Sequence, residues 1–301
     1  MINKMDHISV CICTYKRKEL LARLIGLLQN QNTRNLFDYS ILIVDNDEKK
    51  SAEKVIENIQ KKSIIKIYYY NEPEQNIALA RNKAVDNAKG NYIAFIDDDE
   101  FPIDDWLLKL YESRQKFNVD GVLGPVIPHY EVNPPKWVIK GRFFERPTHA
   151  TGEVLTWKNT RTGNVLMKRA VFSNGENRFN KVFLTSEDRE FFKRMIEKGR
   201  IFAWCNEAYV FETVPANRWK KSFMIKRALF RGKIASNYSD TGFKSLLKSV
   251  LAVFIYFMFL PVSLLIGQHM FMKYIIKLFD HLGKVISYFG IDFMKQKYVT
   301  E

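Results

Sequence analysis

Cysteine is scarce in this sequence: its 301 residues include only Cys11, Cys13 and Cys205. An odd number without the paired spacing of a zinc site argues against a disulfide framework and favours a reducing, cytosolic setting. The sequence also lacks the G-x-G-x-x-G fingerprint and the P-loop, which argues against a dinucleotide oxidoreductase and an NTPase. Residues 1–7 are polar and lead directly into a strand-like segment, so we expect no cleavable signal peptide.

Acidic residues are in the minority: 33 Asp and Glu face 47 Lys and Arg, which gives a formal net charge of +14 at pH 7. A chain this basic is expected to meet anionic partners, namely nucleic acid, nucleotide phosphates or an acidic membrane face. Apolar residues make up 47% and charged residues 27% of the sequence, which is typical of globular chains. The length leaves room for one large α/β domain with an appendage, or for two domains.

The most acidic stretch lies where a strand is predicted to end. The run 97–100, Asp-Asp-Asp-Glu, follows the apolar strand-like segment 92–96 and precedes Pro102 and a helix-like stretch from Asp104. A buried strand with acids at its carboxyl end is the usual layout of a ligand site in an α/β sheet. Oxygen ligands of this kind suit Mg²⁺ or Mn²⁺. The alternative is a solvated acidic turn or helix N-terminus, where Asp is also favourable.

Continuous apolar strands alternate with helical periodicity in the first half of the chain. Strands without polar alternation, separated by helices, predict a parallel sheet covered on both faces. The expected fold class is therefore α/β, with a Rossmann-like, mostly parallel sheet flanked by helices. The strand-like segments are 8–13, 41–44, 64–70, 92–96, 122–126 and 201–210, the early helices are 20–28, 51–62 and 78–88, and 128–147 is an expected irregular loop.

Polar side chains recur at the predicted strand ends, which converge on one crevice in a sheet of this type. Thr14 and Tyr15 follow the first strand, and Asp45 follows the second. An ionised Asp45 accepts hydrogen bonds from a base or a ribose; the alternative is a helix cap or turn residue. Arg81, at the start of a helix with apolar neighbours, is placed to pair with the acidic run or with a phosphate; the alternative is a surface position.

These segments together resemble the large family 2 of inverting glycosyltransferases with the GT-A fold. The resemblance spans roughly residues 7–215 and rests on the order and spacing of the motifs at 10–17, 44–46, 80–82 and 95–100. It implies a nucleotide-sugar donor, with a UDP-sugar expected, and Mg²⁺ or Mn²⁺ at the acidic run. The residues implied to hold the nucleotide and its ribose and diphosphate are Thr14, Tyr15, Asp45, Arg81, Asp97 and Asp98. Asp99 is implied as the main metal ligand with Asp97 beside it, although three consecutive Asp leave open which one touches the metal.

A second acidic pair, Glu187-Asp188, opens a predicted helix, with Ser186 as a candidate cap. Acids in a first helical turn are ordinary stabilising residues. The resemblance instead implies the family's Glu-Asp motif, with Asp188 as the catalytic base and Glu187 as the alternative. Inverting transfer needs a base because the acceptor hydroxyl must lose its proton while it attacks the anomeric carbon. By the same resemblance, Asn164 lies near the donor sugar and Arg218 near the diphosphate.

The composition changes after Pro215. The stretch 218–233 carries Lys and Arg interleaved with aromatic residues and has no acid, which is typical of a membrane-surface helix. Segment 249–267 is apolar and uncharged and roughly long enough to cross a bilayer, but Pro261 interrupts it. We expect domains at 1–215 and 216–301, the second one peripheral, re-entrant or single-span at the cytoplasmic face of a bacterial inner membrane. The alternative is a helix pair buried against the first domain.

The sequence thus predicts a membrane-associated, metal-dependent and inverting transferase of the hexosyl type. It would move a sugar from a nucleotide-diphosphate sugar to a glycan or polyprenyl-linked acceptor in bacterial surface polysaccharide synthesis. Nucleic acid is not an expected partner, because no recognition motif accompanies the basic helix. Two alternatives stay open at this point: a non-catalytic basic scaffold that binds membranes or nucleic acid, and a nucleotidyltransferase that releases pyrophosphate.

Overall fold

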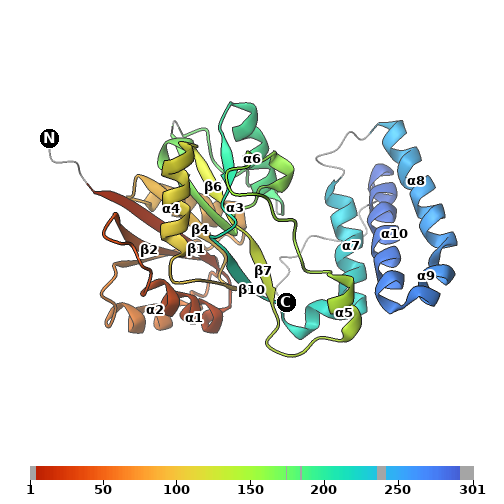
Figure 1. Ribbon diagram of the computed structural model, residues 1–301, viewed down its shortest axis with the longest axis horizontal. Helices are drawn as coiled ribbons and strands as arrows, with labels where there is room; N and C mark the ends of the chain where they lie inside the picture. Colours follow the sequence, from red (N-terminus) through yellow and green to blue (C-terminus); the bar gives the residue numbers. More distant parts are fainter. Residues whose placement is uncertain (1–4, 174, 184, 236–241, 292–301) are drawn as a thin grey trace. The chain divides into compact units, whose positions relative to one another are not determined.

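The computed structural model describes residues 5–173, 175–183, 185–235 and 242–291. These residues form two compact units (Figure 1), one made of 5–129 with 146–213 and the other of 130–145 with 214–291. The segment 130–145, which the sequence places within a first domain, groups with the C-terminal helices. The predicted boundary after residue 215 stays a prediction.

A seven-stranded sheet forms the centre of the first unit. Its strands are β1 (Asp6–Thr14), β2 (Phe37–Asp45), β3 (Ile67–Asn71), β4 (Tyr92–Ile96), β6 (Gly121–Leu123), β8 (Asn164–Lys168) and β9 (Phe202–Trp204). They lie in the order β3-β2-β1-β4-β8-β6-β9. Only β8 runs against its neighbours among these strands, since β1 to β4 are parallel to one another and β6 is parallel to β9. The predicted α/β class with a mostly parallel sheet is confirmed.

Helices cover both faces of this sheet, which explains why its strands are apolar without alternation. The helices are α1 (Lys18–Leu28), α2 (Glu53–Gln60), α3 (Ile77–Asn87), α4 (Trp106–Phe117) and α6 (Glu187–Glu197). Along β1, Ile8, Val10 and Ile12 face a core shared with α1, α2 and α4. Cys11 faces the other core, shared with α3 and α6. The strand is therefore buried on both sides, and its polar groups are left for its ends.

A second sheet of three strands lies in the same unit and consists of β5 (Glu100–Pro102), β7 (Val126–His129) and β10 (Val210–Thr213). β10 lies in the middle, antiparallel to β5 and parallel to β7. Glu212 is the register partner of Glu100, so two carboxylates stand directly opposite each other, which is unfavourable without a cation. Arg146 supplies one, because its Nη2 lies 2.5 Å from Glu212 Oε2.

Two predicted strands are divided between the two sheets, and this corrects the sequence analysis. The segment 122–126 contributes to β6 and β7, and 201–210 contributes to β9 and β10. Near the first crossing, a Cβ atom on Gly124 would lie 2.0 Å from Ala208 O and 2.7 Å from Asn164 Nδ2. In each case the apolar pattern predicts one continuous strand. The pattern reports only that the residues are buried, so it does not reveal where the chain stops pairing with one sheet and begins to pair with the other.

The second unit is helical. It contains α5 (Lys136–Gly141), a short 3₁₀ turn at Ala216–Trp219, α7 (Lys221–Ala235), α8 (Phe243–Met258), α9 (Leu260–Ile266) and α10 (Gln268–Tyr288). α5 interrupts the irregular loop expected at 128–147. α10 packs against the other four α-helices. It approaches α7 closely, since a Cβ atom on Gly232 would lie 2.0 Å from Asp280 O.

In the described part of the chain no single helix is long and apolar enough to cross a membrane, but α8 and α9 meet that test together as a pair bent by 51°. The break falls at Phe259, next to the first turn of α9, which contains Pro261. A break near Pro261 agrees with the sequence. Large apolar side chains of the pair face outward: Phe254 is 63% exposed and Leu265 is 87% exposed.

Candidate active site

The carboxyl ends of the parallel strands bring the predicted polar residues to one edge of the sheet. Thr14 at the end of β1 pairs in register with Asp45 at the end of β2, and Asp45 pairs with Asn71 at the end of β3. The acidic run begins directly after β4 ends at Ile96. The convergence that the sequence predicts is therefore present, and it includes Asn71, which the sequence analysis did not select.

Asp98 is the most firmly held acid of the run. Its Oδ2 accepts a hydrogen bond of 2.8 Å from Thr14 Oγ1, and its Oδ1 lies 3.0 Å from Arg17 Nη1. The same Arg17 nitrogen lies 3.1 Å from Asp99 Oδ2. Burial raises the pKa of Asp98 to about 6, although Arg17 opposes this effect. Thr14 and Arg17 thus fix the acidic turn from the β1 side.

Arg81 joins the acidic run to the start of α6. Its guanidinium forms an ion pair with Glu187, and its Nη2 lies 3.5 Å from Asp97 Oδ1. The Arg81 and Glu187 side chains are 9% and 5% exposed. Burial raises the pKa of Glu187, and the Arg81 guanidinium acts against that shift. Two motifs that lie about a hundred residues apart in sequence are brought into contact by this one side chain.

Asp188 follows Glu187 but has a different environment. It is partly exposed, and its Oδ1 accepts a hydrogen bond of 2.7 Å from the Arg189 backbone N–H. Ser186 stands at the cap position with φ 61°, in the left-handed region that few non-glycine residues occupy. The acid next to the buried ion pair is thus the accessible one.

The side chains of Asp45 and Asn164 form their hydrogen bonds within the protein. Asp45 is 0% exposed and accepts hydrogen bonds from Asp47 N, Ala52 N and Tyr69 Oη, which is the turn and cap role that the sequence leaves open. Asn164 is also 0% exposed. Its amide donates to Pro125 O and Ala208 O and accepts from Trp106 Nε1. Asn164 therefore holds the junction of the two sheets, and its predicted approach to the donor sugar gains no support from this geometry.

The remaining predicted residues are Tyr15 and Arg218. Tyr15 is partly exposed next to Thr14, with Lys16 Nζ 4.8 Å from its ring centroid. Arg218 lies in the 3₁₀ turn of the second unit, and its part in the site stays a prediction. Sequence reasoning gave no role to Arg17, although it belongs to the quoted 10–17 motif. It also missed Arg146 and Glu212, for which the sequence carries no local signal.

The acidic edge presents carboxylate oxygens, which are the ligands that a divalent cation such as Mg²⁺ prefers. The described residues contain no group of three or more His, Cys, Asp or Glu arranged to hold a metal. Mg²⁺ and Mn²⁺ are, however, often bound by one or two carboxylates together with substrate phosphates. Asp97, with a side chain that is 48% exposed, and Asp99 match that requirement. Burial, and after it the neighbouring Asp97 and Glu212, raise the pKa of Glu100 well above its usual range. Asp97 and Asp99 thus offer the carboxylate oxygens that such an ion takes beside a phosphate.

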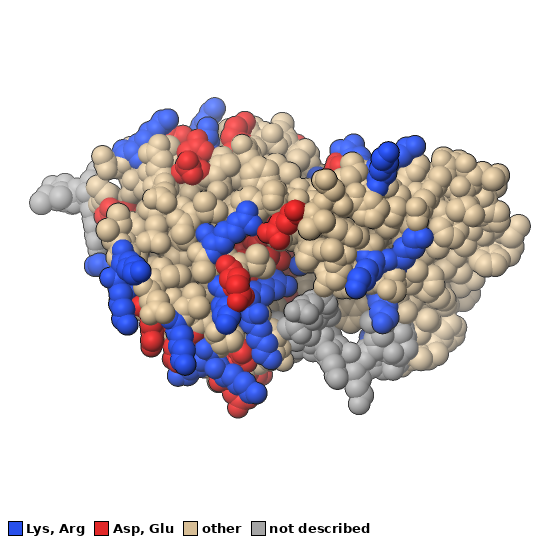
Figure 2. Space-filling model, turned by 90° about the horizontal axis from the view of Figure 1, so that it is seen from below, with Lys and Arg blue, Asp and Glu red and all other residues tan. Residues whose placement is uncertain are grey.

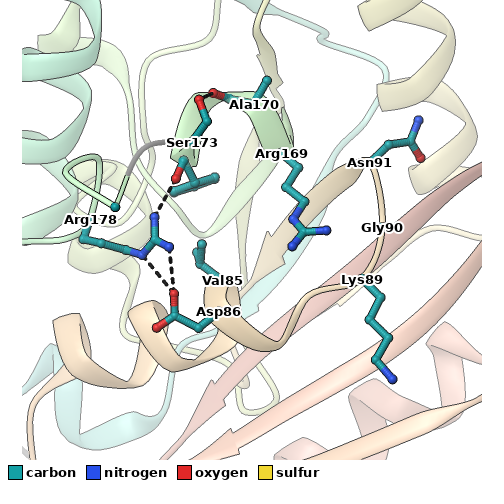
Figure 3. Close-up of a pocket in the computed structure, with 11 residues that line it drawn as sticks. Val85, Asp86, Lys89, Gly90, Asn91, Arg169, Ala170, Ser173 and Arg178 are labelled. Carbon is teal, nitrogen blue, oxygen red and sulfur yellow. Dashed lines mark hydrogen bonds and ion pairs between the residues drawn. The ribbon is translucent and has the colours of Figure 1, made fainter.

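A separate pocket of about 660 Å³ lies at the other end of β4 (Figure 3). Its lining includes Gly90 and Asn91, which precede β4, whereas the acidic run follows that strand. Arg178 crosses it to Asp86, with an Nη2–Oδ1 distance of 2.8 Å. None of the predicted site residues lines this pocket. The pocket lies at the amino end of β4, away from the acidic run.

A mostly parallel sheet with acids and an arginine bridge at its carboxyl edge defines an α/β enzyme of the nucleotide-binding type. Within that class, the chain belongs to glycosyl transferase family 2, whose sequence profile matches residues 9–175. The succinoglycan biosynthesis protein ExoM of Rhizobium meliloti (strain 1021) is 35% identical over 77% of this chain and 75% of its own length.

Other relatives and a solved structure agree with this assignment. The Escherichia coli UDP-Glc:alpha-D-GlcNAc-diphosphoundecaprenol beta-1,3-glucosyltransferase WfaP is 25% identical over 65% of this chain and 72% of its own length. The crystal structure of S. aureus TarS 1-349 in complex with UDP has a TM-score of 0.53 at 16% identity, over 95% of this chain and 93% of that one. The fold is thus of the GT-A type, and the chain is a glycosyltransferase.

Proposed function

We propose that this protein transfers a hexosyl group, with inversion, from a nucleoside-diphosphate sugar to a glycan or polyprenyl-linked acceptor in bacterial surface polysaccharide synthesis. The observation that carries the proposal is the Arg81 bridge between Asp97 and Glu187. Arg81 thereby connects the acidic edge, which would bind a metal and a diphosphate, to Glu187, the residue next to Asp188. The printed names of the relatives, which include a succinoglycan protein and a diphosphoundecaprenol glucosyltransferase, support the type of acceptor.

Asp188 is the proposed general base. A carboxylate in this role takes the proton from the acceptor hydroxyl as the hydroxyl attacks the anomeric carbon. Glu187 is less suited, because it is buried and ion-paired with Arg81, whereas Asp188 is partly exposed. Fixing Glu187 in this way also orients the first turn of α6, and with it Asp188.

The donor, with UDP as its nucleotide, is proposed to lie along the carboxyl edge of the sheet. Tyr15 would face the base, while Asp98 and Thr14 would lie beside the ribose and diphosphate and Arg218 near the diphosphate. Asp45 and Asn164 would act by shaping the edge, since both are buried and hydrogen-bonded. Asp99 and Asp97 would hold Mg²⁺ or Mn²⁺, which when bound offsets the charge of the departing diphosphate.

The second unit is proposed to attach the enzyme to the cytoplasmic face of the membrane. α8 and α9 expose a series of large apolar side chains that includes Phe254, Phe257 and Leu265. Figure 2 shows few charged side chains over these helices on the face drawn. Lysines at 244, 248 and 273 flank the apolar surface. This combination suits an in-plane or re-entrant attachment to an anionic bilayer.

Replacement of Asp188 tests the proposed reaction. We expect Asp188→Asn to lower the rate of sugar transfer by about 10²- to 10⁴-fold, because the acceptor hydroxyl loses its proton acceptor while the shape of the site is kept. The measurement is release of nucleoside diphosphate from a panel of sugar nucleotides with Mn²⁺ and a polyprenyl-diphosphate-linked acceptor. A nucleotidyltransferase would instead release pyrophosphate from a nucleoside triphosphate.

The matched control is Asp86→Asn, which makes the same chemical change at the pocket in Figure 3, where Asp86 is bound by Arg178. The control should transfer sugar at the wild-type rate. Wild-type turnover by Asp188→Asn would remove Asp188 as the base.

A further inference from the structure

The turn before β8 lies against the acidic edge. A Cβ atom on Gly163 would lie 2.7 Å from Glu100 Oε1 and 3.0 Å from Asp97 Oδ2, so the chain passes these carboxylates as closely as glycine allows. Just upstream, Thr160 Oγ1 donates to Trp157 O at 2.7 Å. The 3₁₀ turn Trp157–Asn159 packs against α6, where Lys193 Nζ lies 5.8 Å from the Trp157 ring centroid. The turn therefore lies between the acidic run and the helix that begins with the Glu187-Asp188 pair.

Arg161 in this turn has no bound partner. It forms no hydrogen bond and no ion pair with any residue that the structure describes, although it is partly buried. Three other guanidinium groups near the acidic run are engaged: Arg17 with Asp98 and Asp99, Arg81 with Asp97 and Glu187, and Arg146 with Glu212. Unlike these three, Arg161 has donors that no residue in the described part of the chain accepts from.

Arg161 lies among charges of both signs. Burial and the neighbouring Arg146 lower the pKa of Arg161 to about 10, while Glu100, Asp188 and Glu212 act in the opposite direction. These carboxylates already have other contacts: Glu212 binds Arg146, Glu100 accepts from Asp97 N, and Asp188 accepts from Arg189 N. A partly desolvated guanidinium without an acceptor is unfavourable, and an incoming anion would relieve this.

We propose that Arg161, with Arg146 beside it, binds a phosphate group of a substrate next to Asp188. The planar guanidinium matches a phosphate with two parallel hydrogen bonds, and Asp188 stays free to act on the acceptor. The proposal rests on the proposed function, which supplies two sources of phosphate: the diphosphate of the donor and the diphosphate of a lipid-linked acceptor. In both cases Arg161 would act as a binding residue for phosphate.

The test compares Arg161→Gln, which removes the charge, with Arg161→Lys, which keeps the charge and removes the planar fork. Arg169→Gln is the matched control, because Arg169 is an exposed arginine just beyond the other end of β8. Calorimetry with Mn²⁺ measures the affinity for inorganic pyrophosphate, UDP and uridine, and kinetics give the KM for the polyprenyl-diphosphate-linked acceptor. Thermal unfolding checks that each variant is folded, and the Lys variant keeps the test valid should the Gln variant unfold.

We expect Arg161→Gln to weaken pyrophosphate binding about tenfold or more, since charge-assisted hydrogen bonds are lost, with a smaller loss for Arg161→Lys and none for Arg169→Gln or for uridine. An equal loss of UDP affinity assigns the phosphate to the donor. Unchanged UDP affinity with a raised acceptor KM assigns it to the acceptor.

Pyrophosphate affinity, UDP affinity and acceptor KM within twofold of wild type in Arg161→Gln would overturn the inference, as would a wild-type protein that binds no pyrophosphate. Failure of the proposed function gives a different result: the wild type would bind pyrophosphate in an Arg161-dependent manner but would release no nucleoside diphosphate from any donor.

Discussion

The two units differ in how far their large apolar side chains are exposed to solvent. In the first unit, large side chains such as Trp106 and Phe191 have no exposed surface, because the sheet is covered on both faces. In the second unit, Phe254 and Leu265 of α8 and α9 are 63% and 87% exposed. An exposed apolar surface of this kind marks a contact with another molecule or with a membrane. The first unit thus encloses its apolar core, whereas α8 and α9 of the second unit expose large apolar side chains.

The two units also differ in the kind of group that they leave available for contact with other molecules. In the first unit these groups are polar: they are carboxylates at the strand edge, where Glu100 of β5 lies opposite Glu212 of the neighbouring β10. In the second unit these groups are apolar side chains of α8 and α9. Chemistry and attachment should therefore be separable, so that a change at the acidic edge affects transfer alone and a change in α8 or α9 affects membrane binding alone.

Among the variants that compare the two units, Asp99→Ala has the largest expected effect. We expect it to lower transfer about 10³-fold, since a divalent cation contributes several kcal/mol of charge stabilisation. Sedimentation with anionic vesicles should be unchanged, because α8 and α9 are untouched. Both quantities are measured on the same full-length preparation. A loss of vesicle binding in this variant would break the separation between the units.

The next effect in size concerns the membrane. The double variant Phe254→Lys and Leu265→Lys should lower partitioning to anionic vesicles about 10²-fold, because each buried side chain contributes about 1.5–3 kcal/mol. Ile64→Lys is the matched control, since Ile64 is 91% exposed in the first unit, and it should bind vesicles like the wild type. Equal binding by the double variant and the control would exclude this apolar surface as the attachment site.

The smallest effect compares two helical glycines. Gly232→Ala should destabilise the second unit by about 1–3 kcal/mol through overpacking, since its Cβ would meet Asp280 O. Gly26→Ala in α1 of the first unit meets nothing within 4 Å and should stabilise by up to about 1 kcal/mol. Denaturant unfolding gives both changes in free energy. A Gly232→Ala variant as stable as the wild type would contradict the close packing of α7 on α10.

The sequence is sufficient for the central part of this account because its signals are local. A buried strand followed by acids predicts that Thr14, Asp45 and Asp97 lie at one edge of the sheet, and the strand register pairs Thr14 with Asp45 there. The divided strands at 122–126 and 201–210 are different. Whether a short apolar segment joins one sheet or another depends on partners far along the chain.

The contacts that complete the site are also long-range. Arg81 meets Glu187 across 106 positions, and Arg146 meets Glu212 across 66 positions. Neither pair has a spacing that marks it, although both acids and both arginines are visible in the sequence. Asn164 illustrates the converse: a residue with a plausible functional motif is used to join two sheets.

Calorimetry of UDP binding tests the central claim, that the acidic edge holds a nucleoside diphosphate through a divalent cation, most directly. The account predicts that the wild-type protein binds UDP with Mn²⁺ present, and that withholding the metal or replacing Asp99 with Ala weakens binding at least about tenfold. Equal UDP affinity for the wild type and Asp99→Ala, with and without Mn²⁺, would contradict it.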